Sequence, residues 1–407
     1  MFPAFADPQS PSRPLYVVDM EGLESWLAAQ PVETACWLRD AAFKAGLGEV
    51  ALIPGAGGAV AGGVIGLGTA RARARTRFGL AKAVAVLPAG DWHFTGLPRD
   101  VAAEAALGWL LAQYRFDRYK PAERVLPGLK CPEGVDEAQI LAMAAGEWLT
   151  RDLINTPAQD MGPEELETAF LALAGRFGAA TQVVSGAELE RDFPMVHAVG
   201  KGSDRAPRLL SMRWGTRGPS LTLVGKGVCF DTGGLNLKPS SGMQLMKKDM
   251  GGAATVLGLA QMIMQLGLPV RLRVIVPAVE NSVSGRSMRP KDILRSRKGL
   301  TVEVNDTDAE GRLVLGDALA WAAEENPELL VSMATLTGAA RVAVGPDLAP
   351  YYVDDAGLAQ ALEAGAQAGA DPVWRLPFHD AYESVIEPGI ADLDNAPGYG
   401  FAGSVTA

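Results

Sequence analysis

The stretch SLTLVGKGVCFDTGG, residues 220–234, decides the class of fold. Its first five residues, Ser220 to Val224, are mostly apolar and predict a buried strand. The strand runs directly into a glycine-rich loop that carries Lys226 and Asp231. In open α/β sheets, ligands bind beyond the carboxyl ends of the strands. The stretch therefore predicts that reactive side chains lie at the carboxyl edge of a sheet.

Strands and helices alternate after this stretch. Further strands are predicted at Val270–Val276 and Leu329–Ala334, and helices at Ala253–Leu266 and Leu313–Glu325. This order is typical of an α/β fold in which helices cover both faces of a mainly parallel or mixed sheet.

A smaller α/β domain is predicted on the N-terminal side. Short strands at Glu49–Ile53 and Lys82–Leu87 alternate there with helical stretches such as Val101–Tyr119. The segment Lys120–Val135 is rich in proline, glycine and charge, and a further helix is predicted at Ala138–Ile154. These features place a domain boundary in this segment and predict domains at 1–135 and 136–407.

Two features of the N-terminal part could suggest ligand sites. The glycine segment Gly55–Gly63 lacks the GxGxxG spacing and the later acidic residue of a dinucleotide loop, which favours a surface turn. The alternating arginines Arg71, Arg73, Arg75 and Arg77 could form an anion patch, but charge runs are usually solvated faces.

The composition limits the partners and the compartment. A formal net charge of -10 over 407 residues argues against a nucleic-acid partner held by phosphate contacts. Three widely spaced cysteines fit neither a disulfide framework nor a zinc ribbon, and suit a reducing compartment. No apolar stretch is long and unbroken enough to span a membrane, and the first residues do not resemble a signal peptide. We therefore expect a cytoplasmic protein without a nucleic-acid or membrane partner.

A second polar loop follows another predicted strand. The strand Leu300–Val304 leads into NDTDAEGR, residues 305–312, which adds three carboxylates and a guanidinium. Taken singly, Asp231, Asp306 or Glu310 has an ordinary explanation as a turn or helix cap. Several carboxylates crowded at sheet ends would repel one another unless they are protonated or neutralised by cations. A pair of divalent metal ions is the better hypothesis.

Histidine is not expected among the ligands. The three histidines, His93, His197 and His379, are scattered outside these loops. No GxSxG motif is present either, which argues against a serine hydrolase.

Long motifs in this chain resemble those of the leucyl aminopeptidase family. They are VGKGVCFDTGGLNLKP at 224–239, MKKDMGGAATVLG at 246–258 and TDAEGRLVLGDAL at 307–319, with RDLINTPAQD at 151–160 before them and ATLTGA at 334–339 after them. The resemblance covers the chain from about residue 138 onward. It implies a cytosolic metallo-exopeptidase that removes N-terminal residues from peptides and assembles as a homo-hexamer.

The resemblance also implies a metal-binding role for five residues. Lys226, as a neutral amine, and Asp249 would bind one of two divalent ions, either Mn2+ or Zn2+. Asp308 would bind the other ion. Asp231 and Glu310 would bridge the two.

Catalytic and pocket residues follow from the same match. Lys238 would stabilise the oxyanion of the tetrahedral intermediate, and Arg312 would hold a bicarbonate ion that acts as the general base. The wall of the pocket for the first substrate side chain would be formed by Met246, Thr335, Leu336 and Gly338.

The sequence departs from the family in two places. Asp306 stands where the family commonly has asparagine, and the extra charge could strengthen metal retention, bind a further cation or stay protonated. Relatives also continue past GYGFAGSVTA, residues 398–407, with a strand, a helix and more of the pocket. We expect either a truncated chain or an altered pocket.

Two other functions remain as alternatives. One is a catalytically silent binding or assembly protein that keeps the metals, against which Lys238 and Arg312 argue. The other is a two-metal phosphoesterase, whose sites usually include histidine ligands.

Overall fold

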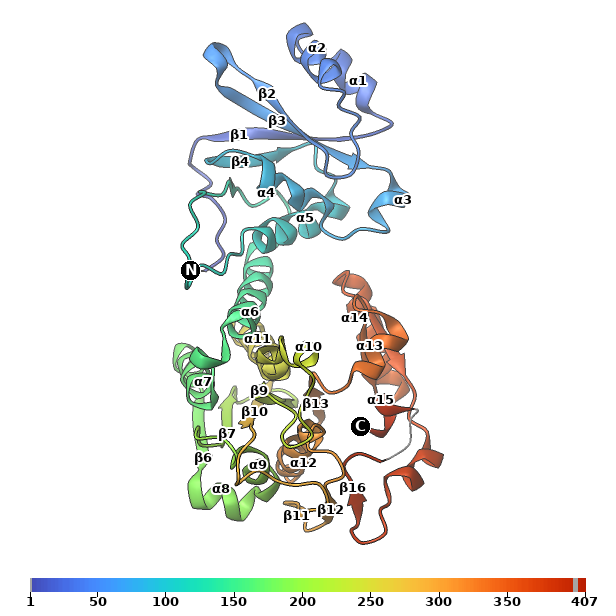
Figure 1. Ribbon diagram of the computed structural model, residues 1–407. Coiled ribbons are helices and arrows are strands. Elements are labelled where there is room, and N and C mark those ends of the chain that lie inside the picture. Colours follow the sequence, from blue (N-terminus) through green and yellow to red (C-terminus); the bar gives the residue numbers. More distant parts are fainter. Residues whose placement is uncertain (1, 398–401) are drawn as a thin grey trace. The chain divides into compact units, whose positions relative to one another are not determined.

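The computed structural model describes residues 2–397 and 402–407. They form two compact units that divide between Trp148 and Leu149, inside helix α6 (Glu137–Asn155; Figure 1). The domain boundary predicted after residue 135 stays a prediction. The first residues of the terminal stretch 398–407, namely 398–401, lie outside the described residues.

A five-stranded sheet forms the centre of the N-terminal unit. Its order is β2-β3-β1-β4-β5, in which β2 is antiparallel to β3 and all other neighbours are parallel. The strands are β1 (Ser12–Asp19), β2 (Val50–Pro54), β3 (Val60–Gly68), β4 (Asp91–Thr95) and β5 (Gly128–Leu129). The helices are α1 (Leu23–Ala28), α2 (Val32–Asp40), α3 (Ala70–Arg73), α4 (Ala83–Val86) and α5 (Arg99–Ala112), with 3-10 turns η1 (Ala56–Gly58) and η2 (Gly79–Lys82).

Two predictions for this unit need correction. The segment Lys82–Leu87 is not a strand, because residues 83–86 form helix α4. Leu80, Ala83, Val84 and Leu87 are buried, and this i, i+3, i+4, i+7 spacing is helical. The helix predicted at Val101–Tyr119 ends at Ala112.

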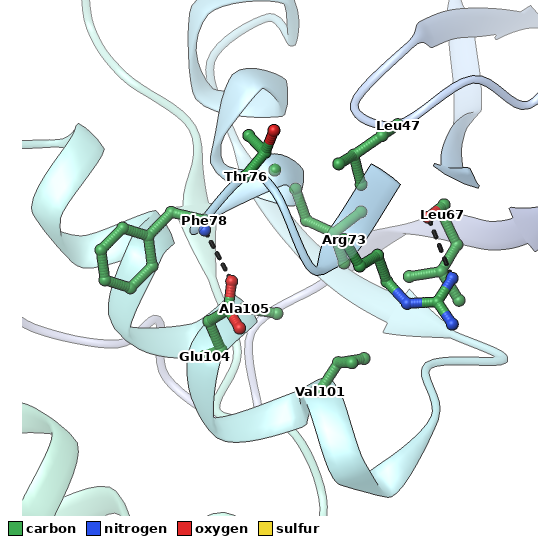
Figure 2. A pocket seen from close by; sticks show the side chains of 10 residues that line it. Leu47, Leu67, Arg73, Thr76, Phe78, Val101, Glu104 and Ala105 are labelled. Atoms are coloured by element: carbon green, nitrogen blue, oxygen red, sulfur yellow. Dashed lines mark hydrogen bonds between the residues drawn. The ribbon is translucent and has the colours of Figure 1, made fainter. Parts of the chain in front are cut away.

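The glycine segment and the arginine run both have structural roles. Residues 55–59 form the turn between the antiparallel strands β2 and β3, as predicted for a surface turn. Arg73 donates from Nη1 to the carbonyls of Leu67 and Gly68, both at 3.3 Å. Figure 2 shows Arg73 and Glu104 at a small pocket of about 40 Å³. Arg73 therefore stabilises the end of β3, whereas Arg71, Arg75 and Arg77 are exposed, as expected of a solvated charge run.

A mixed six-stranded sheet forms the centre of the C-terminal unit. Its order is β13-β8-β10-β7-β6, and β9 also pairs with β10. The pairs β13–β8, β8–β10 and β9–β10 are parallel. Strand β7 pairs antiparallel with both of its neighbours, β10 and β6. The strands are β6 (Ala180–Ser185), β7 (Arg208–Trp214), β8 (Ser220–Gly225), β9 (Gly227–Asp231), β10 (Arg271–Asn281) and β13 (Leu329–Met333). The predicted α/β fold is confirmed.

Helices bury both faces of this sheet. Adjacent residues of β10 point to opposite sides, so that Val274 packs with one hydrophobic cluster and Ile275 with another. The first cluster includes side chains of α7 and α11, and the second those of α8, α9 and α12. Figure 1 shows where these helices lie along the chain. The helices are α7 (Pro163–Phe177), α8 (Gly186–Asp192), α9 (Pro194–Gly200), α10 (Ser240–Met243), α11 (Gly251–Gln265), α12 (Glu310–Ala323), α13 (Gly338–Val344), α14 (Ala356–Ala368) and α15 (Gly403–Thr406).

Short elements complete the C-terminal unit. A three-stranded sheet has the order β11-β12-β16, and β14 pairs with β15. Their bounds are β11 (Ile293–Arg295), β12 (Thr301–Glu303), β14 (Ala349–Tyr352), β15 (Val373–Leu376) and β16 (Leu393–Asp394), with 3-10 turns η3 (Ala158–Asp160), η4 (Met246–Met250) and η5 (Asp380–Ile386). Within the described ranges, no helix has the length and apolar character needed to cross a membrane.

One buried carboxylate joins helices α9 and α12. Helix α9 begins after Phe193, whose side chain makes no capping hydrogen bond. Asp317 of α12 caps it instead: its Oδ2 accepts from the backbone N–H groups of Met195 (2.8 Å) and Val196 (3.4 Å). Its Oδ1 accepts from the backbone N–H of Arg297 at 2.8 Å. Burial raises the pKa of Asp317 to about 6 against the effect of these donors.

We predict that Asp317→Asn destabilises the C-terminal unit by about 1 to 3 kcal/mol, because an amide turns one NH2 group toward buried N–H donors. Urea unfolding followed by tryptophan fluorescence measures the change. The exposed Asp204→Asn is the matched control and should shift the free energy of unfolding by less than about 0.5 kcal/mol. Equal effects of the two variants would contradict the capping role.

Candidate active site

Polar side chains gather at the carboxyl ends of the parallel strands of the C-terminal unit. Lys226 follows β8, and Asp231 ends β9. Asp308 lies in the loop after β12, and Glu310 begins α12. Asp249 comes from the 3-10 turn η4, directly before α11. The site therefore occupies the sheet edge that the sequence indicated.

Lys226 lies between two buried carboxylates. Its Nζ donates to Asp249 Oδ2 at 2.7 Å and lies 2.9 Å from Glu310 Oε1. The Thr335 hydroxyl donates to Asp249 Oδ1 at 2.7 Å, and the Thr335 carbonyl accepts from Lys226 at 3.3 Å. Burial alone would lower the pKa of Lys226, but the Glu310 and Asp249 carboxylates outweigh it and raise the pKa.

Lys238 lies between the other two carboxylates. Its Nζ is 2.8 Å from Asp231 Oδ2 and 2.5 Å from Asp308 Oδ1. Burial would lower the pKa of Lys238, but the close, negatively charged Asp231 and Asp308 carboxylates raise it. Both lysines are therefore cationic in this arrangement.

The carboxylates outnumber the cations in this cluster. Among the described residues, Asp231, Asp249, Asp308 and Glu310 form ion pairs with Lys226 and Lys238, so full ionisation of these six groups leaves two negative charges. Burial raises the pKa of Glu310 to about 8 and that of Asp308 to about 6, and it also raises the pKa of Asp249. The pocket therefore disfavours its own negative charge unless further cations enter.

Several carboxylate oxygens of the cluster accept no hydrogen bond from the described residues. Both Glu310 oxygens and Asp308 Oδ1 are buried without a hydrogen bond among the described residues. Lysine contacts reach Glu310 Oε1 and Asp308 Oδ1, but without the angles of a hydrogen bond. Asp231, Asp308 and Glu310 each offer an oxygen within 4.8 Å of the others. Hard oxygen donors at this spacing fit divalent metal ions.

Arg312 lies in the first turn of α12, near these carboxylates. Burial lowers the pKa of its guanidinium, while Glu310, Asp306 and Asp394 act in the opposite direction. Its Nε is buried without a hydrogen-bond partner in the described parts of the chain. A small anion would satisfy such a donor, and helix N-termini favour anions.

The predicted pocket residues lie on two segments. Thr335 and Leu336 follow β13 and reach the cluster, since Thr335 binds Asp249 and a Cβ on Gly311 would lie 3.1 Å from Leu336 Cδ1. Gly338 begins α13 and is exposed, and Met246 begins η4 and is half-buried.

Asp306 has a local role, because its Oδ1 accepts from the backbone N–H of Asp308 at 2.8 Å.

Buried amides and a hydroxyl that sequence analysis missed support these loops. Asn395 accepts from the backbone N–H of Asn305 at 2.7 Å and donates to the carbonyl of Asp306 at 2.7 Å. Asn281 and Thr307 link the two carboxylate-bearing loops. No charge or motif pattern distinguishes such residues in a single sequence, although Thr307 stands within the TDAEGRL motif.

Comparisons with known proteins agree with this fold and its division into two domains. The model of the cytosol aminopeptidase family catalytic domain matches residues 148–407, and that of the M17 aminopeptidase N-terminal domain matches residues 13–132. A probable cytosol aminopeptidase of Roseiflexus castenholzii is 39% identical over 327 residues, covering 76% of this chain and 67% of that protein.

Two solved structures are similar over nearly the whole chain. The cytosol aminopeptidase of Coxiella burnetii has a TM-score of 0.93 at 39% identity, covering 98% of this chain and 87% of that one. The bottromycin maturation enzyme BotP in complex with Mn has a TM-score of 0.86 at 33% identity, covering 98% and 88%.

An α/β fold with a carboxylate-rich site at the sheet edge defines a class of metal-dependent enzymes. Within that class, the chain belongs to the cytosol aminopeptidase family, whose members are hydrolytic metallo-exopeptidases. The resemblance seen in the sequence motifs is thereby confirmed, together with the order of a small N-terminal domain before a catalytic domain.

We predict that Mn2+ raises the melting temperature of this protein, because a ligand that binds only the folded state stabilises it, by about 2.7 kcal/mol at 100 times its Kd. Glu310→Gln should abolish the shift while keeping metal-free stability within about 1 kcal/mol. The exposed Glu188→Gln serves as control and should keep the full shift in the same thermal assay. A Mn2+ shift that survives Glu310→Gln would contradict the site.

Proposed function

We propose that this protein is an aminopeptidase that hydrolyses the N-terminal peptide bond of peptides with two divalent metal ions. The observation that carries the proposal is the cluster of four carboxylates and two lysines, buried except for the half-buried Lys238 and Asp308, in which the carboxylates outnumber the lysines. Membership of a metallo-exopeptidase family supports the same activity.

The proposed ligands divide into two groups. On metal binding, Lys226 would lose the proton that makes it cationic in the metal-free site and, as a neutral amine, would hold one ion together with Asp249, whose carboxylate lies 2.7 Å from its Nζ. Asp308 would hold the other ion, and Asp231 and Glu310 would be shared by both ions, which is compatible with oxygens of these three residues lying within 4.8 Å of one another. When bound, two Mn2+ or Zn2+ ions supply Lewis acidity for the scissile carbonyl and a nucleophile at neutral pH.

Lys238 is the proposed oxyanion stabiliser. Its side chain is 15% exposed, so the ammonium group can reach a substrate at the edge of the cluster. Its contacts with Asp231 and Asp308 hold it in the charged form that a developing oxyanion requires. A fixed charge in a water-poor site stabilises the transition state more than the ground state.

Arg312 is proposed to hold bicarbonate. Its partly buried guanidinium and the N-terminus of α12 provide the positive potential that such an anion needs. The bound bicarbonate would act as the general base, taking a proton from the attacking water.

The remaining proposals concern the substrate and the assembly. Met246, Thr335, Leu336 and Gly338 form the proposed wall for the first substrate side chain, and methionine would give it an adaptable surface. The resemblance to leucyl aminopeptidases supports a cytoplasmic location and assembly as a homo-hexamer. Light scattering after size exclusion would measure the number of chains in the assembly.

The activity is tested with three substrates on one metal-loaded sample. An aminoacyl anilide should be cleaved, whereas its N-acetylated form and a phosphate ester should not, because the free amine is part of recognition. Cleavage of the ester alone would favour a phosphoesterase, and no turnover of any compound would favour a silent binding protein.

We predict that Lys238→Ala lowers kcat by a factor of about 100 to 1,000 while the metal content per chain stays at that of wild type. Elemental analysis and steady-state kinetics on the same preparation give both quantities. Lys248→Ala removes an exposed lysine nearby and should leave kcat unchanged. Full activity of the Lys238 variant would remove this residue from the mechanism.

We predict that Arg312→Ala also slows turnover and that added bicarbonate partly restores the rate, since the anion then binds by mass action. Equimolar chloride controls for ionic strength. A rate that is normal without bicarbonate would sink the proposed role of Arg312.

A further inference from the structure

We propose that Thr307 and Asn281 are positioning residues that fix the distance and orientation between the loop 231–238 and the loop 305–310. The inference rests on the proposed function, because the two loops carry the proposed ligands Asp231, Asp308 and Glu310. We call the two residues and their hydrogen bonds the Thr307–Asn281 bridge.

Thr307 anchors the first loop from within the second. Its side chain is fully buried, and its hydroxyl donates to the carbonyl of Gly233 at 2.6 Å and accepts from the backbone N–H of Asn236 at 2.8 Å. Its own backbone N–H donates to Asn236 Oδ1 at 2.9 Å. One residue thus satisfies polar groups of the loop that leads from Asp231 to Lys238.

Asn281 connects this anchor to a carboxylate of the site. It ends strand β10 and is 2% exposed. Its Nδ2 donates to Asp231 Oδ1 at 2.9 Å and to the Thr307 carbonyl at 3.0 Å. Its carbonyl accepts from the backbone N–H of Thr232 at 3.0 Å. An amide at the end of a buried strand therefore fixes the orientation of Asp231 relative to the second loop.

The backbone leaves little room for the bridge to move. Gly234 has φ +64, and a Cβ there would lie 2.9 Å from Thr307 Oγ1 and 3.0 Å from Asn281 Oδ1. A Cβ on Gly233 would lie 3.0 Å from Asp308 Oδ1. The glycines let the two loops approach within hydrogen-bonding distance, and the bridge then holds them there.

This geometry connects the bridge to metal binding and catalysis. Asp308 follows Thr307 directly, so a shift of Thr307 moves Asp308 relative to Asp231 and Lys238. Residues that orient metal ligands typically change metal affinity or activity by about 10- to 100-fold when they are replaced. A displacement of about 1 Å in a catalytic group can cost on the order of a hundredfold in rate.

The test compares two substitutions at one position. Thr307→Val keeps the shape and removes the hydroxyl, whereas Thr307→Ser keeps the hydroxyl and removes a methyl group. Calorimetric titration of the metal-free protein with Mn2+ gives the metal affinity, and kinetics on the saturated protein give kcat and KM. Urea unfolding shows that each variant is folded.

We expect Thr307→Val to weaken Mn2+ binding by about 10- to 100-fold and to lower kcat at saturating metal, with Thr307→Ser close to wild type. Asn236→Ala, which removes only the exposed end of the anchor, should act in the same direction with a smaller loss. This variant keeps the test decisive if Thr307→Val fails to fold.

Other outcomes would overturn the inference. If Thr307→Val or Asn236→Ala lowers the stability but leaves metal affinity and kcat at wild-type values, the bridge is a structural contact only. If Thr307→Ser loses as much as Thr307→Val, the methyl packing and not the hydroxyl matters. Failure of the proposed function is distinguishable, because the wild-type protein itself would then show no aminopeptidase activity.

Discussion

The C-terminal unit is organised around one electrostatic constraint, which is that three buried carboxylates, Asp231, Asp249 and Glu310, and the half-buried Asp308 share two lysines among the described residues. Burying like charges is unfavourable unless opposite charges and directed hydrogen bonds compensate. Lys226 and Lys238 compensate in part, and the orphaned oxygens of Glu310 and Asp308 mark where compensation is incomplete among the described residues. Such an arrangement is unfavourable by itself and becomes more favourable when further cations enter it.

The sheet makes this arrangement possible because it is buried on both faces. Packing on two sides fixes β8, β9 and β10, and their carboxyl ends then present Lys226, Asp231 and Asn281 from a rigid edge. Loops alone would hold the same groups less precisely. Helix α12, which begins with Glu310, is also held by the core, because its Asp317 accepts a hydrogen bond from the first turn of α9. The core thus determines the positions of the charged groups.

The sequence predicted the parts of this structure that depend on local pattern. Apolar runs located β8, β10 and β13 of the C-terminal sheet but not β6, β7 or β9, and the motifs singled out Lys226, Asp231, Asp249, Asp308 and Glu310. Lys82–Leu87 was predicted wrongly, since alternating alanine and valine resemble a strand while the buried positions have helical spacing. The antiparallel pairing of β6 and β7, and the contacts of Asn395 with residues 305 and 306, depend on tertiary packing, which one sequence does not display.

The two lysines show how surroundings divide one residue type between two proposed roles. Lys226 is 3% exposed and passes so close to α12 that a Cβ on Gly311 would lie 2.6 Å from its Cε. An amine enclosed in this way lacks access to a substrate, but it is well placed to share a position with Asp249 and Glu310. Lys238 extends from a loop and is 15% exposed, so its charge can act on a bound molecule. Lys226 is enclosed because Gly311 lets α12 pack closely against it, and this enclosure favours Lys226 as the metal ligand. Lys238 is accessible from its loop, which favours it as the group that acts on the substrate.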